Sequence, residues 1–201
     1  MAHDRLVSVA QTIQALYAAH VIPPVQLSGK ESLADGSPPA FRPALQLSGS
    51  FVFMHYYLDT EFNGFAGELI SLALVPEYGD QEFYCSLPLP EKVHNWVELH
   101  VIPYLRHVPP GLDHQLTRVQ AAQHIALYLE GDPDAVIVAD WPEDLAHFCA
   151  LLVTAPGQMA DINGLRFELI NAAGFSAAAN SRVPHNALHD ARALRDFKAG
   201  L

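Results

Sequence analysis

Apolar and aromatic residues crowd the first half of residues 51–64, FVFMHYYLDTEFNG. The first half of this stretch is rich in β-branched and aromatic residues, which predicts a buried strand. Further apolar runs follow, and a turn-like segment between the second and third predicts a hairpin. The all-apolar run AVIVA is typical of a central strand buried on both faces. The predicted strands are residues 51–58, 67–76, 80–86, 135–139 and 165–171.

Helical spacing of apolar residues predicts helices between and after these strands. They span residues 91–104, 115–130, 142–152 and 186–198, and Gly131-Asp132-Pro133 ends the second. Three consecutive strands are thus followed by two helices and then by alternating strands and helices. This order predicts an α/β fold with a mixed sheet, antiparallel in its first three strands and parallel in the later βα units, with helices on both faces.

The N-terminal part of the chain has a different character. Apolar residues at helical spacing from Leu6 to Tyr17 predict one amphipathic helix. Residues 21–50 are then rich in Pro, Gly and Ser, which favours a linker or irregular structure. We therefore expect a boundary near Ser48, with an extension over residues 1–47 and one folded domain over residues 48–201.

The composition and net charge of the chain limit the classes of protein to which it can belong. The 201 residues are 50% hydrophobic, enough for a core, and the net charge of −11 argues against broad, non-specific adhesion to a polyanion. A nucleic-acid substrate held locally stays compatible with that charge. Cys85 and Cys149 form no C-x-x-C motif and are expected to be buried thiols of a reducing compartment. No long apolar span or signal-peptide core appears, so we expect a cytoplasmic protein without a membrane partner.

Two carboxylates follow the first strand. Asp59 and Glu61 are two residues apart, so on a strand they point to the same face. Like charges this close repel each other, and a hard divalent cation with oxygen ligands would relieve the repulsion. The alternative is an exposed pair of acids where a strand runs into a loop.

Two acids compete for a related position in the segment ADWPEDLAHF. Asp140 and Glu143 fit a capping box at the start of the helix over residues 142–152. Asp144 would lie one turn into that helix, where a carboxylate also interacts favourably with the helix dipole. The residues alone leave both candidates open.

The segment PHNALHDARALRDF contains a further candidate pair. His185 precedes the last helix and Asp190 lies within it, a spacing that lets a loop histidine reach a phosphate held at the aspartate's metal. His189 points in a different helical direction and is the weaker candidate. A polar helix start with a solvent-facing acid would also explain this spacing.

Together these motifs resemble the DEDDh 3′–5′ exonuclease family, and most closely its compact bacterial and phage exoribonucleases. DTEFNG with ELISLALV is similar to the first motif and second strand of that group, and HNALHDARAL to its third motif. The resemblance runs from Phe51 to the C-terminus, whereas the first fifty residues match nothing in the family. It favours Asp144 over Asp140 as the acid of the second motif and implies a ribonuclease H-like fold.

The resemblance implies a two-metal phosphodiesterase acting at the 3′ end of single-stranded nucleic acid, with RNA expected over DNA as the substrate. Two Mg²⁺ or Mn²⁺ ions would be held by four carboxylates, and His185 would be the general base. The implied metal ligands are Asp59, Glu61, Asp144 and Asp190. It also implies an aromatic residue stacked on the terminal base, with Phe62 the first candidate and Trp141 the second, although either could serve in packing. Arg182, with Arg192 and Arg195, either contacts substrate phosphates or solvates the last helix.

Other readings stay open. A non-catalytic nucleic-acid-binding module could share the fold, and a phosphodiesterase acting on nucleotides could share the metal site. Subunits of the family commonly pair, which leads us to expect a homodimer. The choice between RNA and DNA depends on contacts to the 2′-hydroxyl that the sequence does not reveal.

Overall fold

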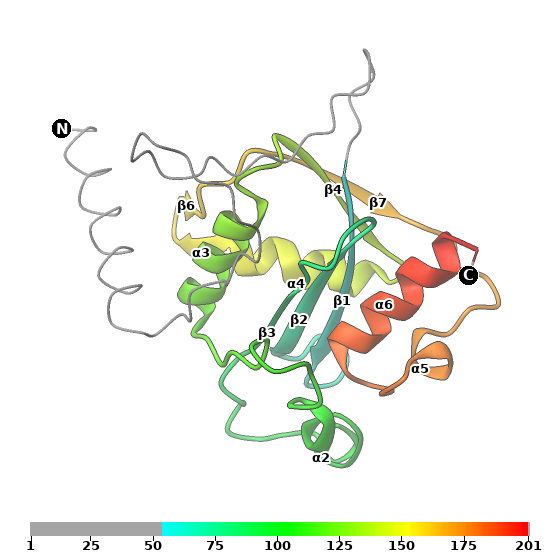
Figure 1. The fold of residues 1–201 in the computed structure, drawn as a ribbon. Helices are drawn as coiled ribbons and strands as arrows, with labels where there is room; N and C mark the ends of the chain where they lie inside the picture. The colour runs from blue at the N-terminus through cyan, green and yellow to red at the C-terminus, as the bar shows by residue number, and fades with distance from the viewer. Residues whose placement is uncertain (1–53, 201) are drawn as a thin grey trace. The chain divides into compact units, whose positions relative to one another are not determined.

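The computed structural model describes residues 54–200, so the predicted N-terminal helix and the Pro/Gly/Ser-rich stretch lie outside the described residues. In the described part, five strands form one mixed sheet in the order β3-β2-β1-β4-β7 (Figure 1). They are β1 (His55–Phe62), β2 (Leu69–Pro76), β3 (Phe83–Ser86), β4 (Asp134–Ala139) and β7 (Gly164–Leu169). The first three pair antiparallel, and β4 pairs parallel with both β1 and β7, which confirms the predicted mixed sheet.

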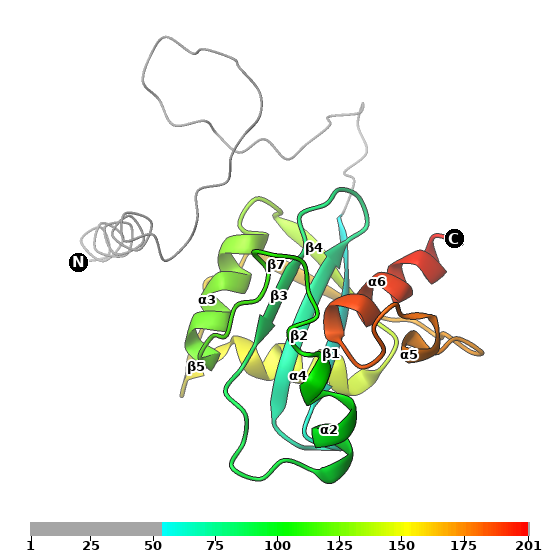
Figure 2. The same cartoon turned by 60° about the horizontal axis from the view of Figure 1, so that its bottom comes forward.

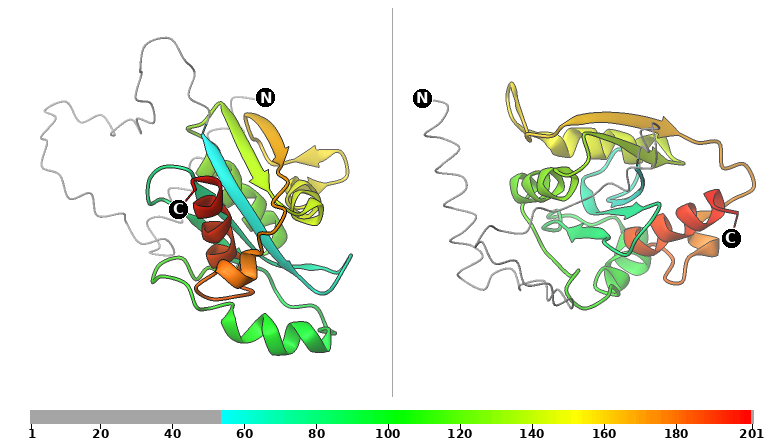
Figure 3. Two further views of the ribbon diagram at one scale, coloured as in Figure 1. Left: turned by 90° about the vertical axis from the view of Figure 1, so that its right-hand side faces the viewer. Right: turned by 45° about the horizontal axis from the view of Figure 1, so that its top comes forward.

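Helices cover both faces of the sheet, as predicted, and the alternation of side chains along β1 explains why (Figure 3). Tyr56 and Leu58 join a core with α3 (Arg118–Leu129) and α4 (Pro142–Leu152) on one face. Tyr57 joins a core with α6 (Ala187–Lys198) on the other. Side chains of period 2 on a strand thus supply both cores from one segment.

Local sequence signals set the helix ends. Thr117 and Gln120 form a reciprocal capping box, and α3 begins three residues inside the predicted range. Pro142 occupies the first turn of α4, where its missing N–H costs nothing, and the helix spans residues 142–152 as predicted.

The predicted helix over residues 91–104 is instead two short pieces, α2 (Asn95–His100) and the 3₁₀ turn η1 (Ile102–Tyr104). Pro103 lacks the N–H needed to continue an α-helix, and its ring clashes with the preceding turn. Three further short elements escaped prediction, the hairpin of β5 (Val153–Ala155) with β6 (Gln158–Met159), and α5 (Ala177–Asn180). Each is too short to carry a periodic pattern.

Two expectations about single residues need correction or refinement. Cys85 is buried as expected, but Cys149 is exposed on α4, so the expectation of two buried thiols is wrong for Cys149. Strand β1 continues to Phe62, so Asp59 and Glu61 lie within the strand and not beyond its end. Within residues 54–200, no helix combines the length and the apolar character needed to cross a membrane.

Candidate active site

Strand β1 carries the first two acids. Asp59 pairs with Ala73 of β2 and Glu61 with Ser71, so both carboxylates lie on the face that α6 covers. The pairing then shifts between Glu61 and Phe62, an irregularity of the kind that often re-aims side chains beside active sites. The predicted same-face placement of the two acids is therefore confirmed.

Helix α4 brings Asp144 to the same strand. Oδ1 of Asp144 accepts hydrogen bonds from the Thr60 hydroxyl at 2.6 Å and from the Thr60 amide at 3.2 Å. Thr60 lies between Asp59 and Glu61, and it and Asp144 are both buried. These two bonds hold the first turn of α4 against the middle of the acid pair.

The capping box predicted for Asp140 and Glu143 is wrong. Trp141 occupies the N-cap position of α4 and makes no side-chain capping bond. Glu143 instead accepts a hydrogen bond from the Ala66 amide at 2.5 Å, which ties α4 to the β1–β2 loop. Pro142 at the first helical position places the N-cap one residue later than the box requires.

The last motif is built around a fully buried residue, Asn186. Its side-chain oxygen caps α6 by accepting from the Leu188 and His189 amides. One turn in, Oδ2 of Asp190 accepts a hydrogen bond from the His185 amide at 3.2 Å. The sequence HNALHD thus folds back on itself so that the residues at its two ends, His185 and Asp190, meet.

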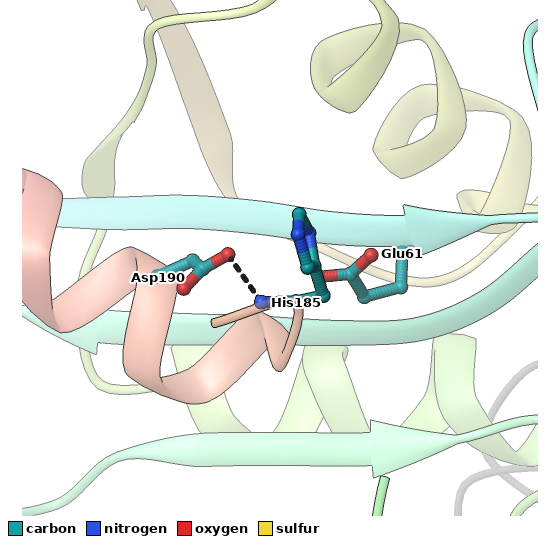
Figure 4. Close-up of side chains that lie close together, drawn as sticks. All are labelled: Glu61, His185 and Asp190. Carbon is teal, nitrogen blue, oxygen red and sulfur yellow. Dashed lines mark hydrogen bonds between the residues drawn. The ribbon is translucent and has the colours of Figure 1, made fainter. Parts of the chain in front are cut away.

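Figure 4 shows where this fold-back lies relative to β1: His185 stands between Asp190 and Glu61. One ligand-type atom from each of the three residues lies within 4.8 Å of the other two. Oδ1 of Asp190 is buried and has no hydrogen-bond partner among the described residues. An orphaned buried carboxylate oxygen of this kind is unfavourable unless a cation or an ordered water completes its contacts.

The electrostatics of the four acids agree with this geometry. Burial raises the pKa of Asp59 and Glu61 well above the ordinary value, and the charges of the neighbouring acids raise it further. Burial likewise raises the pKa of Asp144 to about 7 and that of Asp190 to about 6. No lysine or arginine within residues 54–200 forms an ion pair with any of the four. The cluster is a set of hard oxygen donors that repel one another, which suits a divalent cation.

The aromatic candidates lie close to this cluster in the chain but differ in packing. Phe62 is half-buried, with its ring centroid 4.9 Å from that of His147 on α4. Trp141 is 51% exposed, so the alternative of core packing does not describe it. Phe65, in the loop after β1, is 84% exposed.

A groove of about 670 Å³ lies beside α6, and the arginines that line it are Arg182, Arg192 and Arg195. None of the four acids lines this groove. Arg192 donates from Nε to Glu82 at 2.7 Å and forms a second ion-paired bond with the other oxygen of that carboxylate. Arg195 pairs with its neighbour Asp196. Of the three arginines that line this groove, Arg182 alone forms no ion pair or hydrogen bond with the described residues, so it is the one available there to a phosphate.

Sequence reasoning missed two residues beside the acids. Thr60 holds Asp144, but a threonine on a strand gives no signal of such a bond. Trp96 lies edge-to-face against His185, with the ring centroids 4.8 Å apart, and tilted against His100 at the same distance. The i, i+4 spacing of Trp96 and His100 could have predicted their mutual contact, but not the long-range contact with His185.

Comparison with known proteins adds a partial likeness. Over 80 residues, which are 38% of this chain, the sequence is 41% identical to proteins named 3′-5′ exoribonuclease from two strains of Mycobacterium tuberculosis. The match spans 44% of the length of these relatives. No family model matches the chain. The chain is therefore similar, over part of its length, to proteins that carry an exoribonuclease name.

Proposed function

We propose that this chain is a metal-dependent 3′–5′ exoribonuclease of the DEDDh type, built on a ribonuclease H-like fold. It would hydrolyse the terminal phosphodiester bond at the 3′ end of a single-stranded nucleic acid, for which we propose RNA over DNA. The observation that carries the proposal is the approach of Glu61 of β1 to His185 and Asp190 at the start of α6, which bring ligand-type atoms within 4.8 Å of one another. Two further acids, Asp59 of β1 and Asp144 of α4, interact electrostatically with this group: in addition to burial, the charges of Asp144, Glu61 and Asp190 raise the pKa of Asp59, and that of Asp144 also raises the pKa of Glu61. The name of the partial relatives and the order of the sheet support the same activity.

The chemistry of the donor set suits divalent ions, and we propose two of them. The donors are carboxylates, which suit Mg²⁺ and Mn²⁺, and within the described residues no lysine or arginine forms an ion pair with them. Burial raises their pKa values, even though hydrogen bonds from Thr60 and from the His185 amide lower those of Asp144 and Asp190 in part. We propose Asp59, Glu61, Asp144 and Asp190 as the ligands. When bound, the two ions would supply the charge stabilisation that two-metal phosphodiesterases apply to the attacking and leaving oxygens.

The protein's own residues would then orient the substrate and accept a proton. Burial, with the nearby His100, lowers the pKa of His185. Its imidazole is therefore neutral near pH 7 and can accept a proton from the attacking water. Phe62 and Trp141 would stack on bases near the 3′ end, and Arg182 would contact a phosphate of the strand.

Two further parts of the proposal concern the whole chain. We propose residues 48–201 as the catalytic domain and residues 1–47 as an extension. We also propose a homodimer, in which a second copy would add basic surface to a subunit whose Arg192 and Arg195 are already paired with acids. A monomer mass in solution at micromolar concentration would contradict the dimer without touching the catalytic proposal.

The test is a digest of 5′-labelled RNA and DNA oligonucleotides of one sequence with Mn²⁺ and with EDTA, beside an Asp59→Asn variant. We expect a ladder shortening from the 3′ end that needs Mn²⁺ and is lost in the variant. A 3′-phosphorylated oligonucleotide and a circular RNA should resist. Circular RNA cut at a comparable rate would exclude an exonuclease. Activity confined to a mononucleotide ester would indicate a nucleotide phosphodiesterase. A protein that binds no metal would indicate the non-catalytic nucleic-acid-binding module.

A further inference from the structure

His185 has an uncommon backbone conformation. Its φ of 61° lies in the left-handed region, which, within residues 54–200, only one other non-glycine residue, Ala66, also adopts. Such a conformation persists where the surroundings over-determine it, and it is common at functional sites. The bond from the His185 amide to Asp190 fixes the backbone, but not the direction of the ring.

The segment of residues 95–107, which contains α2 and η1, contacts the start of α6 at three places. Trp96 lies edge-to-face against the His185 ring at 4.8 Å. The amide nitrogen of the Asn186 side chain donates to the Tyr104 carbonyl at 2.8 Å. The Nε2 atom of His189 lies 2.9 Å from the His107 carbonyl oxygen. Figure 2 shows α2 next to the loop that leads into α6.

This segment is itself fixed to the sheet. Val97, Val101 and Leu105 form a buried cluster with Ile70 of β2. The Tyr84 hydroxyl of β3 donates to the Leu105 carbonyl at 2.7 Å. Ile70 is the β2 residue that the shifted pairing beside Glu61 leaves out of register. The sheet that carries Glu61 thus also supports the segment that contacts His185.

We propose that Trp96 is a positioning residue for His185, and that residues 95–107 hold the proposed general base in place over the acids. This role rests on the proposed function. The second ring contact, between Trp96 and His100 at 4.8 Å, holds the indole from the side of its own helix. A base held about 1 Å out of place can cost on the order of 10²-fold in rate, so a positioning role has a measurable size.

The test is a double-mutant cycle on an RNA oligonucleotide. Trp96→Ala should lower kcat by about 10- to 100-fold with KM unchanged. Trp96→Phe, which keeps an aromatic edge, should retain most of the rate. In a His185→Ala background, Trp96→Ala should cost nothing further, because the indole acts through the imidazole. Leu99→Ala is the matched control, since Leu99 is 68% exposed on the same helix and should leave kcat unchanged.

A second variant and a spectroscopic readout keep the proposal testable if Trp96→Ala does not fold. Asn186→Ser keeps a competent N-cap but removes the hydrogen-bond donor to the Tyr104 carbonyl. The decrease in kcat that this variant causes should also vanish in the His185→Ala background. In NMR, the ring-current shift of the His185 Cε1 proton should disappear in Trp96→Ala and persist in Leu99→Ala.

Three results separate the possibilities. A raised KM with unchanged kcat would overturn the positioning role and assign Trp96 to nucleobase stacking. Additive losses in the cycle, with normal wild-type activity, would overturn the positioning role alone. A wild-type protein without nuclease activity, although it folds and binds Mn²⁺, would instead overturn the proposed function on which this role rests.

Discussion

The acid cluster and the arginine groove lie along the same helix, α6, and they handle charge in opposite ways. Asp190 of α6 joins three more carboxylates, and none of the four has a lysine or arginine partner within residues 54–200. The next turns of the helix contribute Arg192 and Arg195 to the groove, and each is already paired with an acid. The negative charge of the acid cluster is thus left without a cationic partner, whereas the positive charge of the groove is largely neutralised by acids of the same chain.

The difference assigns the two regions different tasks. Burying like charges together is costly, so a cluster of this kind is stable only with a cation or with protons. Arginines in ion pairs attract a polyanion only weakly, because an incoming phosphate must compete with the carboxylates. Chemistry is thus concentrated at the acids, and the groove offers at most one free contact, Arg182. Under the proposed function, this division would let a chain of net charge −11 hold a nucleic acid locally without binding it broadly.

Removal of a proposed ligand should give the largest effect. Asp144→Asn should lower kcat by about 10³-fold or more, because a lost ligand oxygen removes several kcal/mol of transition-state stabilisation. Asp140→Asn is the matched control and should retain activity within a few-fold. Asp140 neither caps α4 nor accepts the Thr60 bonds, which go to Asp144. Single-turnover assays at saturating Mn²⁺ measure the rates of the two variants. A dead Asp140→Asn beside an active Asp144→Asn would reverse the assignment of the second motif.

The two histidines at the start of α6 should differ next. His185→Ala should lower the rate by on the order of 10²–10⁴-fold, the usual share of a general base, and leave Mn²⁺ binding largely intact. His189 faces the groove and contacts the His107 carbonyl, so His189→Ala should cost only a few-fold. Rates as a function of pH, with isothermal titration of Mn²⁺, separate the two roles. A larger loss in His189→Ala would mean that the wrong histidine has been assigned as the base.

The sequence predicted most of the scaffold because its long elements carry strong periodic patterns. The strands at 67–76 and 135–139 and the helix at 142–152 appear almost as predicted. The predictions about helix ends are wrong where a single proline sets the end of a helix. Pro103 ends an α-helix early, and Pro142 moves the N-cap from Asp140 to Trp141. Such effects depend on single hydrogen bonds, which periodicity does not report.

The candidate site was predictable in its acids but not in its supports. Asp59, Glu61, Asp190 and His185 lie in compact motifs whose spacing suggests their chemistry. The residues that place them are far away in the chain: Thr60 binds Asp144 across 84 positions, and Asn186 binds Tyr104 across 82. A single sequence offers no local signal for contacts of that range. The pairing of Arg192 with Glu82, across 110 positions, escaped prediction for the same reason.

The uncompensated charge of the cluster should appear in stability as well. Asp144 and Asp190 have folded-state pKa values of about 7 and about 6, above the ordinary 3.8, so the folded state binds more protons than the unfolded state between about pH 4 and 7. The stabilising contribution of these groups is thus present at low pH and lost as pH rises through 6–7. We expect the metal-free protein to melt on the order of 5 °C higher at pH 5 than at pH 8, by differential scanning fluorimetry.

Adding Mn²⁺ at pH 8 should restore that difference, since a ligand that binds only the folded state stabilises it. Asp144→Asn should melt higher than wild type at pH 8 without metal and gain less from Mn²⁺. Glu91→Gln, which removes an exposed acid outside the cluster, is the control and should change neither response. A melting temperature that is flat with pH and indifferent to Mn²⁺ would contradict the idea that the acids lack compensation.

The smallest effects should come from the groove, where charge is already balanced. Arg182→Ala should raise KM for RNA by about threefold, in keeping with one exposed charge contact, and leave kcat unchanged. If Arg182 touches a phosphate, the variant should also reduce the dependence of log KM on log salt by about 0.7, the value for one contact to a single strand.

Glu82→Gln tests the neutralised side of the same comparison. It would release Arg192 from its carboxylate partner while keeping a side chain of nearly the same shape. If pairing is what keeps Arg192 from the substrate, KM should fall by about twofold to threefold and the salt dependence should steepen by about 0.7. The double variant Glu82→Gln/Arg192→Ala should lose that gain. A Glu82→Gln protein with unchanged KM and salt dependence would mean that the strand does not pass through the groove, and the acids would then be the only described region that meets the substrate.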